Sequence, residues 1–322
     1  MPDIRKSKDK LNKRLDSDFK KSGSKVVRDM KNTNHAQLDK SRDNLIDAIN
    51  KSRRDGTRLD INDPAIKKYQ AELERLTKRQ IGLLDASGER IVLDSISTAK
   101  DFFGEFILGD PRVFSFIDVE TINNAINYIN KPEWNSLLKR LGNNQLDRSS
   151  NIIINGLIQE LSPRQIARQL VNASNMIYND ALTLTRTLQL TSYRDTYAIY
   201  QLENQDFITK QIRIASLDAR CCLACIALHG TEIPVGSRID DHYNGRCIGV
   251  SVTVGYNKSI KSGSEWFATL PANKQKEIMG IGNYTAYKEG KVSLEDYVKE
   301  VNDPIFGKQI IQDSLYNAKR KK

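Results

Sequence analysis

The strongest constraint on this chain is the segment 217–247, which concentrates its cysteine and histidine residues. All four cysteines lie within it, together with two of the three histidines, His229 and His242. The segment opens with Leu-Asp-Ala-Arg-Cys-Cys-Leu-Ala-Cys and closes with Asp-Asp-His-Tyr-Asn-Gly-Arg-Cys. Thiol and imidazole groups bind metals and act as nucleophiles more readily than most side chains. We therefore expect any reactive or metal-binding site of the chain to lie here.

The spacing within this segment predicts a structural zinc site with three sulfur ligands and one nitrogen ligand. Its expected ligands are Cys222, Cys225, His242 and Cys247. Cys221 or His229 could replace one of them. Two other interpretations stay open on spacing alone, namely reduced and partly buried thiols, or a disulfide. The chain begins without a signal-peptide pattern, so we expect a reducing compartment, in which disulfides seldom persist.

Two predicted strands flank the cysteine segment. Side chains alternate between apolar and polar over 209–216 and over 248–254, which is typical of half-buried strands. A two-stranded ribbon is marginally stable in water, whereas a structural zinc ion contributes on the order of 10 kcal/mol of apparent binding energy. We expect the metal to hold the ribbon and its loop together and to take no part in catalysis.

The cysteine segment resembles the signature of the phage minor head protein family, the Mu F-like head morphogenesis proteins. That family has an Asp-x-Arg-x-Cys-x-x-Cys-like segment followed by a His-Pro-x-Cys-Arg-Cys-like closure. The matching residues are Asp218, Arg220, Cys222, Cys225, Leu228, Gly230, His242, Arg246 and Cys247. The chain differs at Tyr243, where proline is usual, and at Gly245, where a cysteine is usual. An earlier predicted helix also resembles the family, through Ser162, Pro163, Ile166, Ala167, Arg186 and Thr187.

The resemblance covers about residues 157–300 and implies a structural protein of a tailed-phage head, present in few copies and without enzymatic activity. The implied partners are the portal protein, major capsid or scaffolding proteins, and packaged double-stranded DNA. The implied location is the virion, in the head interior or at the portal vertex, and the host cytoplasm during assembly. Two alternatives come from other classes: a zinc-supported, nuclease-like DNA-processing enzyme and a free-standing basic nucleic-acid-binding protein. The nuclease hypothesis is weakened because no histidine follows His242.

Positive charge is concentrated at the start of the chain. The net charge is +10, and residues 1–60 contain 17 lysines and arginines, 10 aspartates and no glutamate, which leaves +7 in this region. Leu11, Leu15 and Phe19 form one thin apolar stripe, too narrow for a core of its own. We interpret 1–62 as a basic arm, extended or helical, that is solvated or disordered alone. We expect it to become ordered against nucleic acid or a larger assembly, with its lysines and arginines neutralising the phosphates of duplex DNA without sequence preference. The candidate contacts there and in the basic tail are Lys6, Lys10, Lys13, Arg14, Lys20, Lys21, Arg53, Arg54, Lys319 and Arg320.

The predicted fold class is α+β and predominantly α-helical, with a helical body, a small Cys/His-pinned β-ribbon and a short helical C-terminal segment. The predicted divisions are a basic arm, 1–62; the helical body, 63–205; the ribbon module, 206–256; and the C-terminal segment with its basic tail, 257–322. Helix starts are expected at Asp63-Pro64, Ser162-Pro163 and, more weakly, Ser293, and helix ends near a turn at Ser87-Gly88 and at Gly142. No apolar run approaches the ~20 residues of a membrane span, so we expect a soluble protein.

Overall fold

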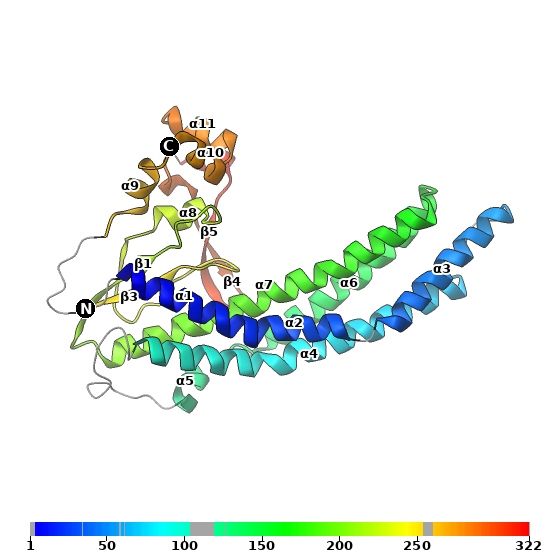
Figure 1. Ribbon diagram of the computed structural model, residues 1–322, viewed down its shortest axis with the longest axis horizontal. Helices are drawn as coiled ribbons and strands as arrows, with labels where there is room; N and C mark the ends of the chain where they lie inside the picture. Colours follow the sequence, from blue (N-terminus) through cyan, green and yellow to red (C-terminus); the bar gives the residue numbers. More distant parts are fainter. Residues whose placement is uncertain are drawn as a thin grey trace. The chain divides into compact units, whose positions relative to one another are not determined.

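A computed structural model describes residues 4–33, 35–57, 59, 60, 62–103, 119–125, 127–253 and 260–321. The fold is α+β and predominantly helical, as the sequence predicts, with small antiparallel sheets (Figure 1). None of the helices in these ranges combines the length and apolar character that a bilayer crossing requires.

The helices and strands follow one another along the chain with the longest helices in its first two thirds. The α-helices are α1 (Ile4–Lys21), α2 (Gly23–Asn32), α3 (Ala36–Arg54), α4 (Pro64–Phe103), α5 (Val119–Ala125), α6 (Pro132–Ile158), α7 (Pro163–Glu203), α8 (Leu223–Ala227), α9 (Gly263–Ala268), α10 (Ala272–Met279), α11 (Ile281–Lys288) and α12 (Leu315–Ala318). The strands are β1 (Ile208–Ile214), β2 (Glu232–Ile233), β3 (Ile248–Thr253), β4 (Val298–Asp303) and β5 (Gly307–Gln312), and a 3-10 turn, η3 (Glu295–Tyr297), precedes β4.

The chain forms two compact units, each drawn from separated segments. The first unit contains described residues of 1–17, 92–128 and 187–322, and the second those of 18–91 and 129–186. Helices α1, α4 and α7 therefore contribute residues to both units. The divisions predicted at 62, 205 and 256 follow changes in sequence pattern, whereas the compact units follow contacts between distant segments.

The second unit is a helical assembly whose start signals are readable in the sequence. Asp63 caps α4, since its Oδ1 accepts a hydrogen bond from the backbone N–H of Ala65 at 2.8 Å. At α7, the Gln165 side chain accepts from the Ser162 N–H at 2.8 Å, and Ser162 Oγ accepts from the Gln165 N–H at 3.3 Å. This reciprocal pair is the capping box that the Ser-Pro-x-Gln order predicts. The core between these helices includes Leu45, Ile66, Leu73, Ile153, Ile166 and Leu170.

The sequence predicts helix ends at two glycines, Gly88 and Gly142. Both lie inside helices, so both predictions were wrong. Helix α4 continues through Ser87-Gly88 to Phe103, and α6 continues through Gly142 to Ile158. A Cβ at Gly88 would lie 2.9 Å from Ile129 Cγ2, and one at Gly142 would lie 2.5 Å from Ile81 Cδ1. Both glycines provide room for a neighbouring isoleucine, which spacing along one helix does not reveal.

The N-terminal region is helical, and its sparse apolar residues are buried. Leu11 is 1% exposed and Leu15 is 3% exposed in the first unit, and Met30 and Leu45 are buried in the second. The region takes the helical one of the two forms expected for the arm, but it is not a solvated or disordered segment, because the thin stripe is covered by residues distant in sequence. For example, the Gln189 side chain donates a hydrogen bond to the Leu15 carbonyl at 3.0 Å.

The predicted ribbon is present in the first unit as the antiparallel pair β1–β3, with Ile212 opposite Val250, and β2 extends it to the order β2-β1-β3. Helix α7 covers β3, since Tyr197 Oη accepts from the Ser251 N–H at 3.1 Å. The helix expected from Ser293 was wrong: only η3 forms, followed by the β4–β5 hairpin. Tyr297 is nevertheless fully buried. The chain does not continue as a helix after Tyr297, because Val298 begins a strand and pairs with Gln312.

Candidate metal centre

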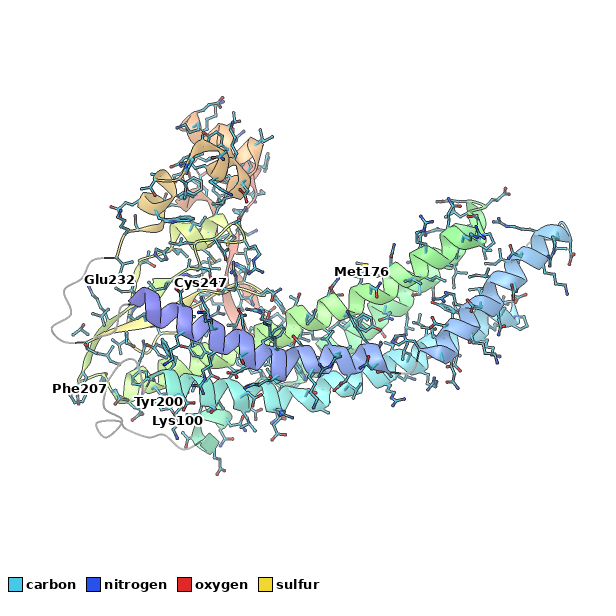
Figure 2. All side chains as sticks on the ribbon, in the orientation of Figure 1. Lys100, Met176, Tyr200, Phe207, Glu232 and Cys247 are labelled. Carbon is cyan, nitrogen blue, oxygen red and sulfur yellow. The ribbon has the colours of Figure 1, made fainter. Side chains whose placement is uncertain are left out.

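Strand pairing brings the two ends of the cysteine segment together. Ile214, the last residue of β1, lies opposite Ile248, the first residue of β3. After β1 the segment forms the short helix α8, adds β2 to the sheet and enters β3 through Cys247, which Figure 2 labels. Cys222 caps α8, since its Sγ accepts from the Cys225 N–H at 3.3 Å. A helix cap thus orients the first predicted ligand toward the second.

Three of the four predicted ligands form a compact triad. Cys222 Sγ lies 3.3 Å from His242 Nε2, and Cys225 Sγ lies 3.6 Å from the same nitrogen. The three ligand atoms all lie within 4.8 Å of one another. Zinc–sulfur bonds of about 2.3 Å and zinc–nitrogen bonds of about 2.0 Å place tetrahedral ligands roughly 3.5–3.8 Å apart. The spacing of the triad therefore suits one tetrahedral ion.

The imidazole of His242 has the tautomer that a metal ligand needs. Its Nδ1 lies 2.8 Å from the Tyr243 carbonyl oxygen, which can only accept, so Nδ1 carries the hydrogen. In the neutral ring the lone pair is then on Nε2, which faces the two sulfurs. Such a backbone hydrogen bond is the usual way in which a protein orients a metal-binding histidine.

Cys247 belongs to a second, overlapping triad with Cys225 and Asp241, all of them buried. Asp241 is already engaged, because it accepts from the N–H groups of His242 at 3.0 Å and Cys247 at 2.9 Å. It also pairs with Arg194. The structure therefore brings three of the four predicted ligands into one group and places Cys247 beside Cys225, outside the group that contains Cys222 and His242.

Two buried arginines surround the centre, and sequence reasoning missed both of them. Arg194 Nη2 lies 2.9 Å from Asp241 Oδ2, and Arg213 Nη2 lies 3.4 Å from Oδ1. The side chains of the two arginines are 4% and 3% exposed, and that of Asp241 is fully buried. Burial raises the pKa of Asp241, but the two guanidinium groups outweigh it and hold that pKa below its usual range.

The buried charges favour an anionic centre. Two guanidinium groups and one carboxylate leave one uncompensated positive charge in a region shielded from water, where it is costly. A divalent ion held by three thiolates and one neutral imidazole carries one net negative charge. The charge of this metal centre and the charge of the arginines and Asp241 around it then sum to zero. The charged surroundings therefore suit a divalent ion with three cysteine ligands.

Three of the four thiols, those of Cys221, Cys225 and Cys247, have a raised pKa. The hydrogen bond between Cys222 and Cys225, together with burial, raises the pKa of the Cys225 thiol. The hydrogen bond with Cys225 and burial likewise raise the pKa of Cys247. Burial raises the pKa of Cys221 to about 12. Nucleophilic cysteines need a lowered pKa, so these three thiols have the opposite tuning.

The alternative ligands lie outside both triads. Among the described residues, neither group close enough to hold an ion includes Cys221 or His229. His229 is buried, and its Nδ1 accepts from the Ala215 N–H at 3.0 Å. Its ring therefore helps to fix the chain that leaves β1.

Ion pairs and the C-terminal hairpin brace the loop that carries His242. Asp218 and Arg246 form a two-pronged ion pair with both distances at 2.6 Å, which joins the two ends of the cysteine segment. Tyr243 Oη donates to Asp303 Oδ2 at 2.9 Å, and its ring packs edge-on against Phe306. Tyr243 thus anchors this loop to the β4–β5 hairpin.

The candidate nucleic-acid residues do not gather in one unit. Lys6, Lys10, Lys13, Arg14, Lys319 and Arg320 belong to the first unit, and Lys20, Lys21, Arg53 and Arg54 to the second. The side chain of Lys6 falls outside the described residues. Arg14 pairs with Asp101, and Arg53 donates to the Leu161 carbonyl at 2.6 Å. Lys13, Lys20, Lys21 and Arg54 are exposed.

No family model, curated protein or solved structure matches this chain. The phage-head hypothesis is therefore based on the motif residues and on their arrangement.

Proposed function

We propose that this chain is a structural minor head protein of a tailed phage that acts at the portal vertex during head assembly. The observation that carries the proposal is that motif residues far apart in sequence meet at one centre. Asp218 pairs with Arg246, and Cys222 and Cys225 meet His242. A motif that serves as a scaffold needs such contacts between its two ends, and they give each of these residue types a structural role.

The earlier part of the resemblance joins the same centre. Thr187 on α7 accepts a hydrogen bond through its Oγ1 from the Asn244 N–H at 3.0 Å. Arg194, about two turns further along α7, donates to the carbonyl oxygens of Gly245 at 2.7 Å and Cys247 at 2.8 Å. The helix and the cysteine segment are therefore parts of one structure, as a shared signature would require.

We further propose that one structural zinc ion is held by Cys222, Cys225, His242 and Cys247. The spacing of Cys222, Cys225 and His242, the histidine tautomer and the charge of the two arginines support this assignment, and Cys247 lies next to Cys225 as the proposed fourth ligand. Bound zinc would supply cross-linking between α8 and the loop before β3. The carboxylate of Asp241 is engaged by two arginines and two backbone N–H groups, so it is poorly placed to activate water for hydrolysis.

The basic residues of the N-terminal helices are proposed to contact packaged double-stranded DNA. Lys13, Lys20 and Lys21 are exposed and carry charge that phosphate binding requires. Replacing all three by glutamine should lower the slope of log affinity against log salt by about 0.9 for each phosphate that is no longer neutralised. An unaltered slope in a filter-binding titration would place the DNA-binding surface elsewhere.

Localisation in phage particles tests the head assignment. Mass spectrometry of purified heads should find the protein in few copies, and it should co-purify with the portal ring. A metal-dependent nuclease assay on plasmid DNA should show no cleavage. Absence from purified heads, or cleavage abolished by Cys222→Ser, would overturn the proposal in favour of the enzyme or of the free-standing DNA-binding protein.

A further inference from the structure

Two large apolar side chains are exposed on adjoining helices near the C-terminus. Ile281, the first residue of α11, is 77% exposed, and Tyr316 on α12 is 70% exposed. Among the described large hydrophobic residues only Ile158, in the other unit, is comparably exposed. One exposed apolar side chain is common on a protein surface, but two on adjoining helices present apolar area that a partner can cover.

The two helix starts adjoin each other on a packed base. A Cβ at Gly282 would lie 3.8 Å from Leu315 Cδ2, so the residues next to Ile281 and Tyr316 are within van der Waals reach of each other. Beneath them, Ala286, Leu294, Tyr297 and Ala318 belong to one buried cluster. The exposed pair is therefore held by a rigid base and does not lie on a loose tail.

The basic tail contributes a preorganised arginine to this surface. The Arg320 guanidinium lies over the Tyr316 ring, 5.5 Å from its centre, and Nη1 donates to the Tyr316 hydroxyl at 3.3 Å. Lys319 is exposed beside it, and its charge helps to lower the pKa of Glu289 on the α11 side, after the larger effect of Lys291. By contrast, Lys321 is bound to the carbonyl oxygens of Asp296 and Val298. The surface thus presents apolar groups edged by positive charge.

We propose that Ile281, Tyr316, Lys319 and Arg320, here called the α11–α12 patch, form the docking site for an acidic protein surface. The fitting partner has an apolar socket for Ile281 and Tyr316, with carboxylates at its rim for Arg320 and Lys319. Tyrosine and arginine are over-represented among residues that dominate protein interfaces, and a stacked arginine has already lost much of its rotamer freedom.

The mixture of apolar and basic side chains in the α11–α12 patch favours a protein over nucleic acid as its partner. A phosphate backbone would attract Lys319 and Arg320 but would leave Ile281 uncovered. A carboxylate-rimmed socket satisfies all four residues. This inference assigns two of the candidate DNA-binding residues, Lys319 and Arg320, to a protein interface, and it does not depend on the phage-head assignment.

Site-specific photocrosslinking tests the patch in cells that produce the native protein. Benzoylphenylalanine replaces Tyr316 in one variant and Phe207 in the matched control, because Phe207 is also exposed, at 46%, in the same unit (Figure 2). Peptide mapping should find a crosslink from position 316 to an acidic protein segment that position 207 does not reach. Crosslinks only to nucleic acid, crosslinks shared by both positions, or none would overturn the proposal.

Binding measurements with the crosslinked partner then test the chemistry. Ile281→Ser and Arg320→Glu should each weaken binding at least about tenfold, whereas Phe207→Ser should leave it unchanged. Melting temperatures of Ile281→Ser and Arg320→Glu should stay close to that of the native protein, because both side chains are exposed. Equal effects of the control and the patch variants would refute the assignment. If the crosslinked partner is an acidic protein that does not belong to a phage head, the docking proposal holds and the proposed function fails. Failure of the one is therefore distinguishable from failure of the other.

Discussion

Asp241→Asn tests whether the buried charges hold the candidate metal centre in place. The substitution keeps the size of the side chain but leaves the guanidinium groups of Arg194 and Arg213 buried without their shared carboxylate. Removing one member of a buried ion pair costs about 3–5 kcal/mol, because the remaining charge is uncompensated. For a unit of this size, that loss lowers the melting temperature by roughly 6–20 °C.

Calorimetry and urea unfolding at pH 7 measure the effect against a matched surface variant. Glu300→Gln removes one partner of an exposed pair, in which Glu300 lies 2.7 Å from Lys308 Nζ, and should change stability by about 0–1 kcal/mol. Adding Arg213→Met to Asp241→Asn should recover about 1–3 kcal/mol relative to the sum of the single variants. A loss below about 1 kcal/mol for Asp241→Asn would refute the charge argument.

The lowered pKa of Asp241 predicts how the stability of the protein changes at acidic pH. A carboxyl group with a lowered pKa in the folded state contributes stability above its unfolded pKa near 4, and that contribution is lost as the pH falls. The difference between the native protein and Asp241→Asn should therefore stay constant from pH 8 to pH 5 and shrink below pH 4. A difference that grows with acidity would contradict the assignment of Asp241 as an ionised carboxylate.

Three further outcomes test separate features. Protein produced with zinc should contain about one ion per chain by mass spectrometry. Cys222→Ser should lose the ion, whereas the neighbouring Cys221→Ser should retain it. Equal retention by both variants would refute the ligand set. Gly156→Ala should cost about 1–3 kcal/mol in urea unfolding, because the new Cβ lies 2.6 Å from Ile166 Cγ1, whereas Gly82→Ala, with open space around it, should gain about 0.5–1 kcal/mol. Burial raises the pKa of Asp195 to about 7. The protonated carboxyl is therefore favoured in the fold, and stability falls as the pH rises from about 4 to 7. Asp195→Asn should flatten that part of the stability profile, and an unchanged profile would contradict this assignment.

Local features of the candidate centre could be predicted from the sequence, and long-range ones could not. The Cys222–Cys225 step, the strands on either side and the Ser162 capping box are each set by residues a few positions apart. Arg194 and Arg213 gave no such signal. Arg194 lies within a long amphipathic helix and Arg213 within an alternating strand, where a charged residue is normally solvent-facing.

The same limit explains the errors in the fold. Gly142 follows an apolar periodic run and the basic residues Lys139 and Arg140, as expected at a helix end, but its position is determined by Ile81 on another helix. The β4–β5 hairpin was missed because Val298 and Val301 are its only strongly apolar residues on the first strand, which is too few for an alternating pattern. Its turn is stabilised by Asp303, which accepts from the N–H groups of Ile305 and Phe306 at 2.9 Å.

The structure also changes what the metal is needed for. The sequence suggested that a two-stranded ribbon requires zinc, but β1 and β3 are paired along their length and β3 is covered by α7 through Tyr197 and Gln201. The His242 loop has fewer backbone bonds of its own and is held by side chains of Asp218 and Tyr243. Chelation should therefore speed amide hydrogen exchange in the loop and α8 while β1 and β3 stay protected. Exchange that rises equally in the sheet would mean that the metal, and not α7, stabilises the strands.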